Sequence, residues 1–264
     1  MLAEAYDFRD ESEALYDLIK PLSEDDYDKV TLFMDWTIND VLQHLHYFNY
    51  VADLTLSDED AFVQTYSELK VFQETSGSLV DATDKMLKGL KGIALRDAWH
   101  DYYHEMADRF HAADPKQRLK WVGPSMSARS SISARLMETW SHAQEIYDLL
   151  GAERQNEDRI KSIAVMGINT FGWTFKNREE TIPDDVPHIR LTAPSGDIWE
   201  WNESNAADLI EGDAAEFCQV VTQTRNIADT SLNVTGDIAT RWMAVAQCFA
   251  GPARTPPAAG TRHA

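Results

Sequence analysis

The chain has 264 residues, of which 44% are hydrophobic, 10% aromatic and 26% charged, a composition typical of one or two folded globular domains. Its 24 Lys and Arg stand against 44 Asp and Glu, and the formal net charge of −20 argues against nucleic-acid and membrane partners, whose phosphates it would repel. With no apolar run near the ~20 residues of a membrane-spanning helix and no basic N-terminal signal segment, we expect a cytoplasmic protein.

The first two-thirds of the chain are predicted to be helical. Apolar residues recur at spacings of three and four over residues 1–20, and Pro21 ends that pattern. Thr37 is the expected N-cap of a helix that continues to about residue 52, with Asp40 in its first turn. Further helices are expected over about 58–92, 94–113, 127–151 and 156–178. Long helices joined by short turns predict an up-and-down bundle over residues 1–182.

The pattern changes after Pro183. The stretch HIRLTAPSGDIWEWNE alternates apolar and polar residues on both sides of Ser-Gly-Asp, which predicts a β-hairpin. Two later segments each read as a strand, a Gly-Asp pair and a helix, with the pairs at Gly212-Asp213 and Gly236-Asp237. These features predict a small α/β domain over 183–251, followed by a flexible Pro/Ala/Gly-rich tail over 252–264. The predicted fold class is therefore α+β.

The chemistry must rest on histidines and carboxylates, because the sequence contains neither a phosphate-binding glycine loop nor a G-x-S-x-G elbow. Glu138 and His142 are four residues apart, so on a helix they differ by only about 40° and can share a divalent ion. A solvated surface pair is the alternative. A third ligand would come from His44 or His46, which lie about 200° apart around their helix and are barely separated by periodicity.

A rival group lies on the helix expected over 94–113, where His100, His104 and His111 form one stripe. His104 and His111 are about 10.5 Å apart along the axis and cannot share an ion. His100 and His104 could form a two-histidine half-site, but their acidic neighbours favour a solvated face instead. The two cysteines, Cys218 and Cys248, lie in apolar stretches and are predicted to pack in the core.

Three segments resemble a known family. Trp36-Thr-Ile-Asn-Asp-Val-Leu-Gln-His-Leu45 is similar to the W-T-x-x-D-V-L-x-H-L segment of the DinB-like, maleylpyruvate-isomerase N-terminal domain family. Trp121-Val-Gly-Pro-Ser-Met126, followed by Ala134-Arg-Leu-Met-Glu-Thr-Trp-Ser-His142, resembles the fourth helix of its actinobacterial-type metal-binding branch. Downstream, Ile210–Arg225 and Gly236–Met243 resemble the small sterol-carrier-like C-terminal domain of that branch.

The resemblance implies a DinB-like four-helix bundle whose metal ligands are His44, Glu138 and His142. It selects His44 because the family histidine directly precedes a leucine, as His44 precedes Leu45. Two nitrogens and one oxygen suit Zn²⁺, with Ni²⁺ or Fe²⁺ as alternatives. Family members include thiol-cofactor-dependent isomerases and S-transferases, which implies a low-molecular-weight thiol as a second cofactor. Arg225 matches an arginine that contributes to activity, although the family's Gly-Arg pair is Thr224-Arg225 here.

Two functions remain open on the sequence. The first is a metal-dependent enzyme, monomer or homodimer, that activates a thiol or water toward a small anionic substrate as an isomerase or S-transferase, with a hydrolase or lyase as alternatives. Arg129, Arg135 and Arg225 could anchor the anion, Trp36 could line the pocket, and we expect the active site between the two domains. The second is a non-catalytic small-molecule or lipid-binding protein that uses the apolar stripe around Phe217 and Trp242.

Overall fold

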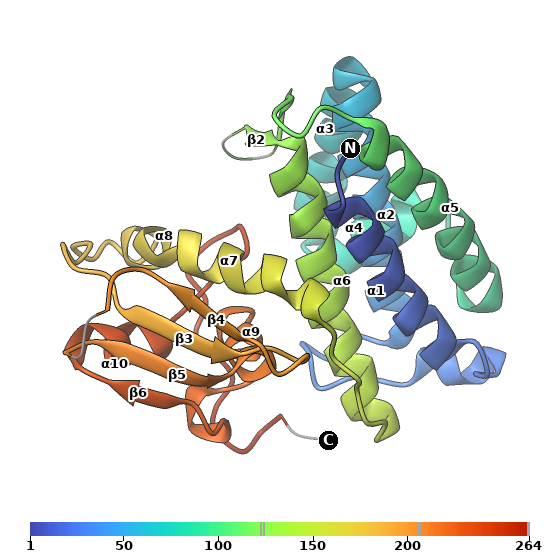
Figure 1. Ribbon diagram of the computed structural model, residues 1–264. Coiled ribbons are helices and arrows are strands. Elements are labelled where there is room, and N and C mark those ends of the chain that lie inside the picture. Colours follow the sequence, from blue (N-terminus) through green and yellow to red (C-terminus); the bar gives the residue numbers. More distant parts are fainter. Residues whose placement is uncertain (122, 124, 205–206, 263–264) are drawn as a thin grey trace. The chain divides into compact units, whose positions relative to one another are not determined.

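The structure is a computed structural model that describes residues 1–121, 123, 125–204 and 207–262. The chain divides into two compact units, Met1–Leu149 and Leu150–Ala264 (Figure 1). The sequence put this boundary near residue 182, whereas in the structure the helical segment after Leu150 groups with the sheet. The combination of helices with a small sheet confirms the α+β class. None of the described helices is long and apolar enough to cross a membrane.

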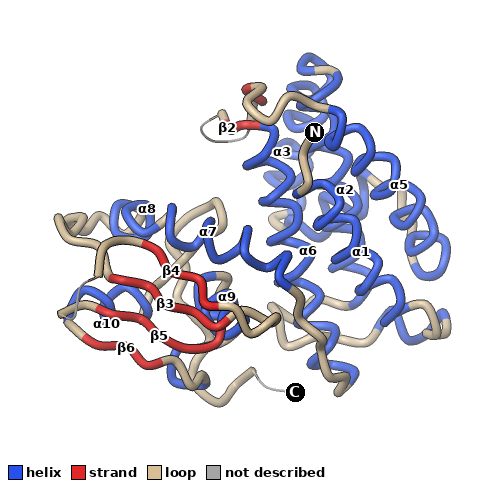
Figure 2. The backbone as a smooth tube through the Cα atoms, viewed as in Figure 1, coloured by secondary structure: helices blue, strands red, loops and turns tan. Residues whose placement is uncertain are grey.

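The first unit is almost entirely helical (Figure 2). Its helices are α1 (Glu4–Ile19), α2 (Ile38–Ser57), α3 (Glu59–Ser76), α4 (Leu79–Met86), α5 (Gly92–Ala112) and α6 (Ala128–Leu150), with a 3₁₀ turn η1 (Glu24–Asp28) and a short pair of strands, β1 (Arg118–Leu119) and β2 (Met126–Ser127). Val122 and Pro124 of the family-like Trp121–Met126 segment lie outside the described residues.

The helix expected over 58–92 is in fact two helices. Gly77 ends α3 in the left-handed conformation, with φ +74°, where a residue without Cβ is favoured. The Ser78 side chain then accepts a hydrogen bond from the Asp81 N–H and caps α4. The periodicity of apolar residues continued across this break, so it could not reveal that the chain turns at Gly77.

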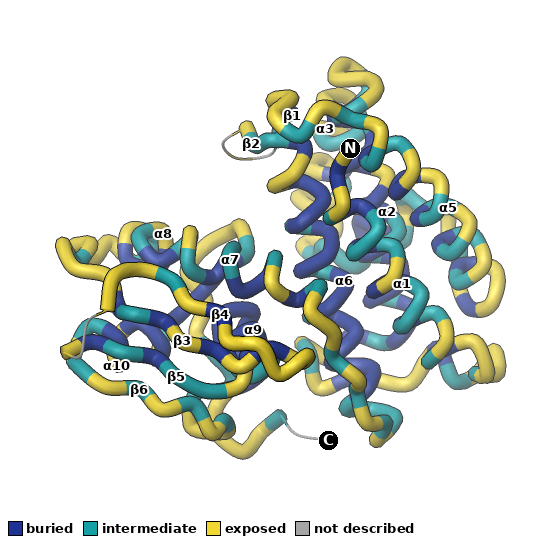
Figure 3. The backbone as a smooth tube through the Cα atoms, viewed as in Figure 1, coloured by how far each residue is buried: buried dark blue, intermediate teal, exposed yellow. Residues whose placement is uncertain are grey.

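Helices α1 and α2 both pack against α5, and α6 is buried along most of its length (Figure 3). The largest fully buried side chains of this unit include Trp99, Trp140, Tyr103, Phe8 and Phe110. Trp140 therefore belongs to the hydrophobic core. The long helix α2 carries the predicted ligand His44, and α6 carries Glu138 and His142.

The second unit contains a four-stranded sheet in the order β4-β3-β5-β6. The strands are β3 (His188–Thr192), β4 (Ile198–Trp201), β5 (Leu209–Asp213) and β6 (Asn233–Thr235); the helical segments are η2 (Asp158–Ile160), α7 (Lys161–Asn169), α8 (Phe171–Lys176), α9 (Ala214–Val221), η3 (Ile227–Asp229) and α10 (Asp237–Met243). Strands β3 and β4 pair antiparallel with Thr192 opposite Ile198, which confirms the hairpin. Gly212 lies inside β5 rather than in a turn after it.

Two other expectations for this unit need correction. The helix expected over 156–178 is interrupted at Thr170, where α7 ends and the Thr170 hydroxyl lies 2.9 Å from the carbonyl oxygens of both Met166 and Gly167. The tail expected to be flexible is hydrogen-bonded to the unit through its backbone. Asn226 Nδ2 donates to the Pro257 carbonyl, and the Gly260 N–H donates to the Asp229 carboxylate. Polar side chains of the domain thus fix a segment whose composition suggested a loose tail.

The apolar stripe of the second unit is part of its core. Phe217 and Trp242 are at most 1% exposed and pack edge to face with ring centroids 5.9 Å apart. Cys218 and Cys248 are both buried, and burial raises the pKa of the Cys218 thiol well above its usual value. Packing, as predicted, accounts for both cysteines. The stripe gives no support to a lipid-binding function, because its side chains are already covered.

Candidate metal centre

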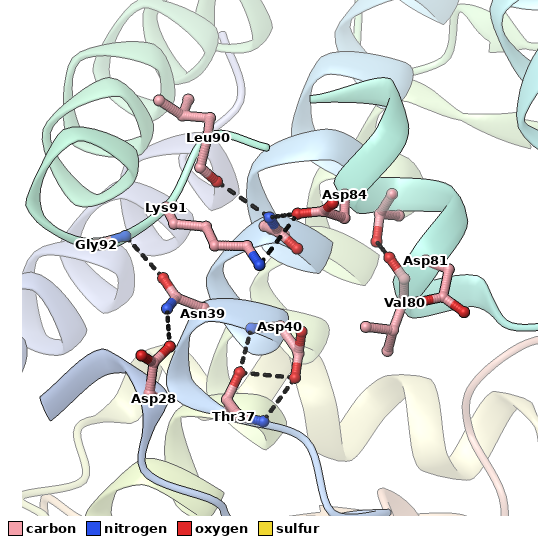
Figure 4. A network of polar contacts seen from close by, with 12 residues as sticks. Asp28, Thr37, Asn39, Asp40, Val80, Asp81, Asp84, Leu90, Lys91 and Gly92 are labelled. Carbon is pink, nitrogen blue, oxygen red and sulfur yellow. Dashed lines mark hydrogen bonds and ion pairs between the residues drawn. The ribbon is translucent and has the colours of Figure 1, made fainter. Parts of the chain in front are cut away.

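A capping box fixes the start of α2 (Figure 4). The Thr37 hydroxyl oxygen accepts a hydrogen bond from the Asp40 N–H at 3.1 Å, and the Asp40 carboxylate accepts from the Thr37 N–H at 2.8 Å. This confirms Thr37 as the N-cap. Asn39 adds a second anchor, since its amide donates to Asp28 and accepts from the Gly92 N–H. These bonds set the position of α2 about two turns before His44.

The rotation of α2 is fixed by the residue next to His44. Gln43 is fully buried, and its Nε2 donates to Asp84 Oδ1 at 2.8 Å and to the Leu90 carbonyl at 3.0 Å. Lys91 also pairs with Asp84, so the end of α4 and the start of α5 converge on this point (Figure 4). Because Gln43 faces α4 and α5, its neighbour His44 turns toward α6.

The structure brings His44, Glu138 and His142 together. His44 Nε2 on α2 lies 3.1 Å from Glu138 Oε2 on α6, and His142 Nε2 lies 3.5 Å from the same oxygen. The three potential ligand atoms lie within 4.8 Å of one another. Their side chains are 12%, 24% and 10% exposed, respectively. Two imidazole nitrogens and one carboxylate oxygen from two packed helices thus face a common point.

Burial controls the charge of this cluster. Burial lowers the pKa of His44 to about 4, so its imidazole is neutral near pH 7. Burial alone would raise the pKa of Glu138, but hydrogen bonds from His142 and His44 outweigh it and hold that pKa well below its usual value. Neutral imidazole and ionised carboxylate are the forms that bind a metal ion.

Aromatic rings surround the three side chains. The Trp36 ring is nearly parallel to the His142 ring at 5.6 Å, the Phe33 ring meets His142 edge-on at 5.0 Å, and the Phe48 ring lies 4.8 Å from His44. These contacts restrict the orientation of both imidazoles. The sequence pointed to Trp36 but not to Phe33 or Phe48. Phe48 could have been found, because it follows His44 by four residues on one face of α2.

The loop before α2 delivers Phe33 and Trp36 to this position. Met34 and Asp35 both have left-handed backbone conformations, with φ of +52° and +58°. Non-glycine residues rarely adopt this conformation, which costs about 1–2 kcal/mol per residue. The Thr31 N–H donates to the Trp36 carbonyl at 2.7 Å and closes the loop. Left-handed backbone at two non-glycine residues is not readable from composition, which explains why Phe33 was missed.

His46 does not join the cluster. Its Nδ1 is buried and has no hydrogen-bond partner among the residues that the structure describes, and its ring meets Tyr102 edge-on at 5.6 Å. Burial lowers the pKa of His46 to about 4. Periodicity alone could not separate the two histidines. In the structure, His44 contacts Glu138 of α6 and His46 contacts Tyr102 of α5.

The histidine stripe of α5 is divided in the structure. His100 and His104 both contact Glu13 of α1, at 3.5 Å and 3.0 Å. His111 instead lies 2.9 Å from the Leu2 carbonyl through Nδ1 and stacks on Tyr6. The acidic surroundings expected from the sequence therefore hold for the first two, although the acid that they share, Glu13, comes from α1, and only His100 also contacts an acid of α5, Asp101 at 3.3 Å. Neighbours on α5 were the only acids that the sequence could place beside them.

The three candidate arginines have different surroundings. Arg129 is exposed and pairs with Glu4 at 3.0 Å. Arg135 is only 3% exposed, and its Nε donates to Asn49 Oδ1 at 2.9 Å. Burial lowers the pKa of Arg135 to about 10. Arg225 follows α9 and is only 9% exposed, with Nη1 donating to the Thr224 carbonyl.

Comparisons with known proteins agree with the resemblance. The family model described as the mycothiol maleylpyruvate isomerase N-terminal domain matches residues 8–147. Two Mycobacterium tuberculosis proteins named as uncharacterized, MT0041 (strain CDC 1551 / Oshkosh) and Rv0036c (strain ATCC 25618 / H37Rv), are each 34% identical over 246 residues, covering 93% of this chain and 95% of theirs.

Two solved structures share the fold. The crystal structure of the mycothiol-dependent maleylpyruvate isomerase has a TM-score of 0.51 and 13% identity, covering 82% of this chain and 86% of that one. A point mutant of the same enzyme gives the same TM-score at 12% identity. At this level of identity, the likeness concerns the fold alone.

Proposed function

The chain belongs to the mycothiol maleylpyruvate isomerase N-terminal domain family, and we propose that it is a metal-dependent enzyme whose ion is held by His44, Glu138 and His142. The observation that carries the proposal is the convergence of three ligand atoms within 4.8 Å on two packed helices. Two imidazoles and a carboxylate are a known catalytic zinc set, and Ni²⁺ and Fe²⁺ accept the same donors.

The surroundings of these residues fit a divalent ion. Metal binding requires a neutral His44 imidazole and an ionised Glu138 carboxylate, and both protonation states are favoured without an ion. His44 Nδ1 is buried without a hydrogen-bond partner among the described residues, so the rings of Trp36 and Phe48, not an outer carboxylate, orient this imidazole. Three protein ligands leave coordination positions for a substrate, which is the arrangement of catalytic rather than structural sites.

A bound divalent ion would lower the pKa of a thiol or water at its open position and so supply a nucleophile near neutral pH. We favour a low-molecular-weight thiol, because the family description and the structural neighbour both name mycothiol. The rings of Phe33, Trp36 and Phe48 would limit access of bulk water and strengthen electrostatic interactions at the site. The proposed reaction is accordingly an isomerisation or an S-transfer.

The surroundings of Arg135 favour a small anionic substrate. Its Nη2 is buried with no hydrogen-bond partner among the described residues, and the same is true of Asn49 Nδ2. Buried donors without acceptors are costly, and a substrate carboxylate would satisfy both of them. The charge of Arg135 acts on both His44 and Glu138, so this cation lies beside the proposed ligands. Arg225 remains a proposed substrate-binding residue on the resemblance alone.

Metal analysis tests the proposal without knowledge of the substrate. Tag-free protein should contain one tightly bound divalent ion per chain, which Glu138→Gln should lack. Cobalt-substituted protein should develop a thiolate absorption band when mycothiol is added, and an assay with mycothiol and maleylpyruvate would then test turnover. Retention of the tight ion in a His44→Ala/Glu138→Gln variant that is still folded would overturn the assignment of the ligands.

A further inference from the structure

We propose that the first unit carries a second, weaker site for a first-row transition-metal ion, formed by Glu13 of α1 with His100 and His104 of α5. His100 Nε2 lies 3.5 Å and His104 Nε2 lies 3.0 Å from Glu13 Oε1. The three potential ligand atoms are within 4.8 Å of one another. This site shares no residue with the centre proposed above, so each can fail independently.

The backbone predisposes these side chains to a common ion. His100 and His104 are one helical turn apart on α5, and their ring centroids are 4.8 Å apart. α1 packs along α5 and contributes Glu13 from the opposite side. The ligands are therefore fixed on two helices that already contact each other, and little ordering is needed on binding.

Outer contacts hold the ligands in orientations suited to a metal. The Tyr103 hydroxyl donates to Glu13 Oε2 at 2.7 Å, which leaves Oε1 directed at the two imidazoles. Asp101 Oδ1 lies 3.3 Å from His100 Nδ1, so a carboxylate supports the ring nitrogen that faces away from Glu13. Such carboxylate–histidine pairs orient imidazoles in known metal sites. The Tyr16 ring, 4.1 Å from the His100 ring, adds a packing restraint.

The competing explanation is a pair of histidine–glutamate ion pairs. It accounts for His104 at 3.0 Å, whereas His100 at 3.5 Å makes only a long contact, equal to that of His142 with Glu138 in the first centre. An ion bound to all three atoms is compatible with both distances. Two nitrogens and one oxygen select Zn²⁺, Ni²⁺, Co²⁺ or Cu²⁺ over Mg²⁺ and Ca²⁺, which prefer oxygen ligands.

The exposure of the cluster predicts that this site is the weaker of the two. Its side chains are 27–39% exposed, so water competes for the ion and screens the charges. A net charge of −20 nevertheless favours cation binding over the surface. Since the ligands come from α1 and α5, occupancy would cross-link these helices and stabilise the first unit.

Titration of tag-free, full-length protein with Zn²⁺ alone tests the proposal. The chelator-treated wild type should bind two equivalents, the second more weakly, and the second should raise the thermal midpoint further. In His100→Gln/His104→Gln, the second equivalent should weaken at least about tenfold, while the tight one remains. His111→Gln is the matched control, because this histidine lies on α5 outside the cluster.

A single equivalent in the wild type that persists in the double variant, or an unchanged second equivalent in that variant, would overturn the second site. Glu13→Gln provides an independent variant if the double substitution perturbs folding, and circular dichroism establishes that each variant is folded. Loss of the tight equivalent in Glu138→Gln concerns only the proposed catalytic centre. Failure of either site is thus distinguishable from failure of the other.

Discussion

Among the residues described, the first unit twice brings together two histidines and one glutamate. The inner cluster has Glu138 and His142 one turn apart on α6, with His44 from α2. The outer cluster has His100 and His104 one turn apart on α5, with Glu13 from α1. In both, a long helix supplies two ligands and a packed neighbour supplies the third. The clusters differ in their surroundings: the inner side chains are 10–24% exposed and the outer ones 27–39%.

This difference shows that the surroundings, not the set of ligands, decide what such a cluster can do. Aromatic rings cover the inner cluster, where a low dielectric strengthens interactions with a substrate and bulk water is limited. The outer cluster is held by Tyr103 and Asp101 and is open to water. As proposed, it would bind an ion, but its 27–39% exposed side chains would not enclose a substrate. The predictions below test this division, from the largest expected effect to the smallest.

Glu138→Gln should have the largest effect. It keeps the shape of the side chain but removes the charge that both histidines contact, so affinity for the tight ion should fall by more than about 100-fold. Turnover should fall below detection. Metal content after dialysis and the mycothiol-dependent assay measure the two effects. Glu74→Gln, at an exposed position on α3, is the control and should match the wild type. Normal turnover in Glu138→Gln would remove the inner cluster from the mechanism.

Spacing on a single helix predicted two of the three side chains of each cluster. The four-residue separations of Glu138 from His142 and of His100 from His104 are visible in the sequence, because a helix turn is local. The third ligands depend on how distant helices pack. His44 could be chosen over His46 only through the resemblance to a family, and Glu13 was not considered at all. Packing between α1 and α5 is a tertiary property that periodicity does not encode.

In the fold, too, features that depend on neighbouring residues were predictable and features that depend on tertiary structure were not. The N-cap at Thr37 and the hairpin around Ser195-Gly196-Asp197 were predictable, because each depends on a few neighbouring residues. The breaks at Gly77 and Thr170 were not, since the apolar pattern continues across both. The left-handed backbone at Met34 and Asp35, which delivers two rings to the inner cluster, has no signature in residue type.

Arg135→Met should raise KM while leaving metal content unchanged. A hydrogen bond to a charged group is worth about 1.5–3 kcal/mol, so loss of the substrate contact should raise KM about 10- to 150-fold. The substitution also removes the donor of buried Asn49 Oδ1, so the thermal midpoint should fall in either case; a raised KM with unchanged kcat and metal content is what separates a substrate contact from a structural role. Arg129→Met is the exposed control. An unchanged KM would exclude Arg135 as the anchor.

Arg225→Ala tests whether the second unit contributes to catalysis. We expect KM to rise or kcat to fall by about tenfold, the loss of one charge-assisted contact, with the tight ion retained. The alternative explanation is that the Arg225 cation stabilises a helix C-terminus. It predicts only a loss of about 0.3–1 kcal/mol in the free energy of unfolding. Arg241→Ala, exposed and paired with Glu180, is the control. Unaltered kinetics in Arg225→Ala would leave substrate binding to the first unit.

Thr37→Ala should produce a smaller and indirect effect. Loss of the N-cap should cost about 1 kcal/mol of unfolding free energy, or about 2–4 °C in thermal midpoint. Because α2 carries His44, affinity for the tight ion should also weaken, by a few-fold. Ser78→Ala is the matched control: it removes the cap of α4, which carries no ligand of the inner cluster. Equal metal affinity in both variants would show that the capping box does not position His44.

The smallest effect is expected in His100→Gln/His104→Gln, and it bears most directly on the comparison. If the outer cluster only binds an ion, turnover should stay within about twofold of the wild type, as expected for sites that do not share partners. The weaker zinc equivalent should be lost in the same protein, so one variant separates ion binding from catalysis. Turnover is measured with the tight ion loaded and free zinc removed by a chelator. A large loss of turnover under those conditions would mean that the histidines of α5 act in catalysis. The difference in exposure would then not separate a catalytic cluster from one that only binds an ion.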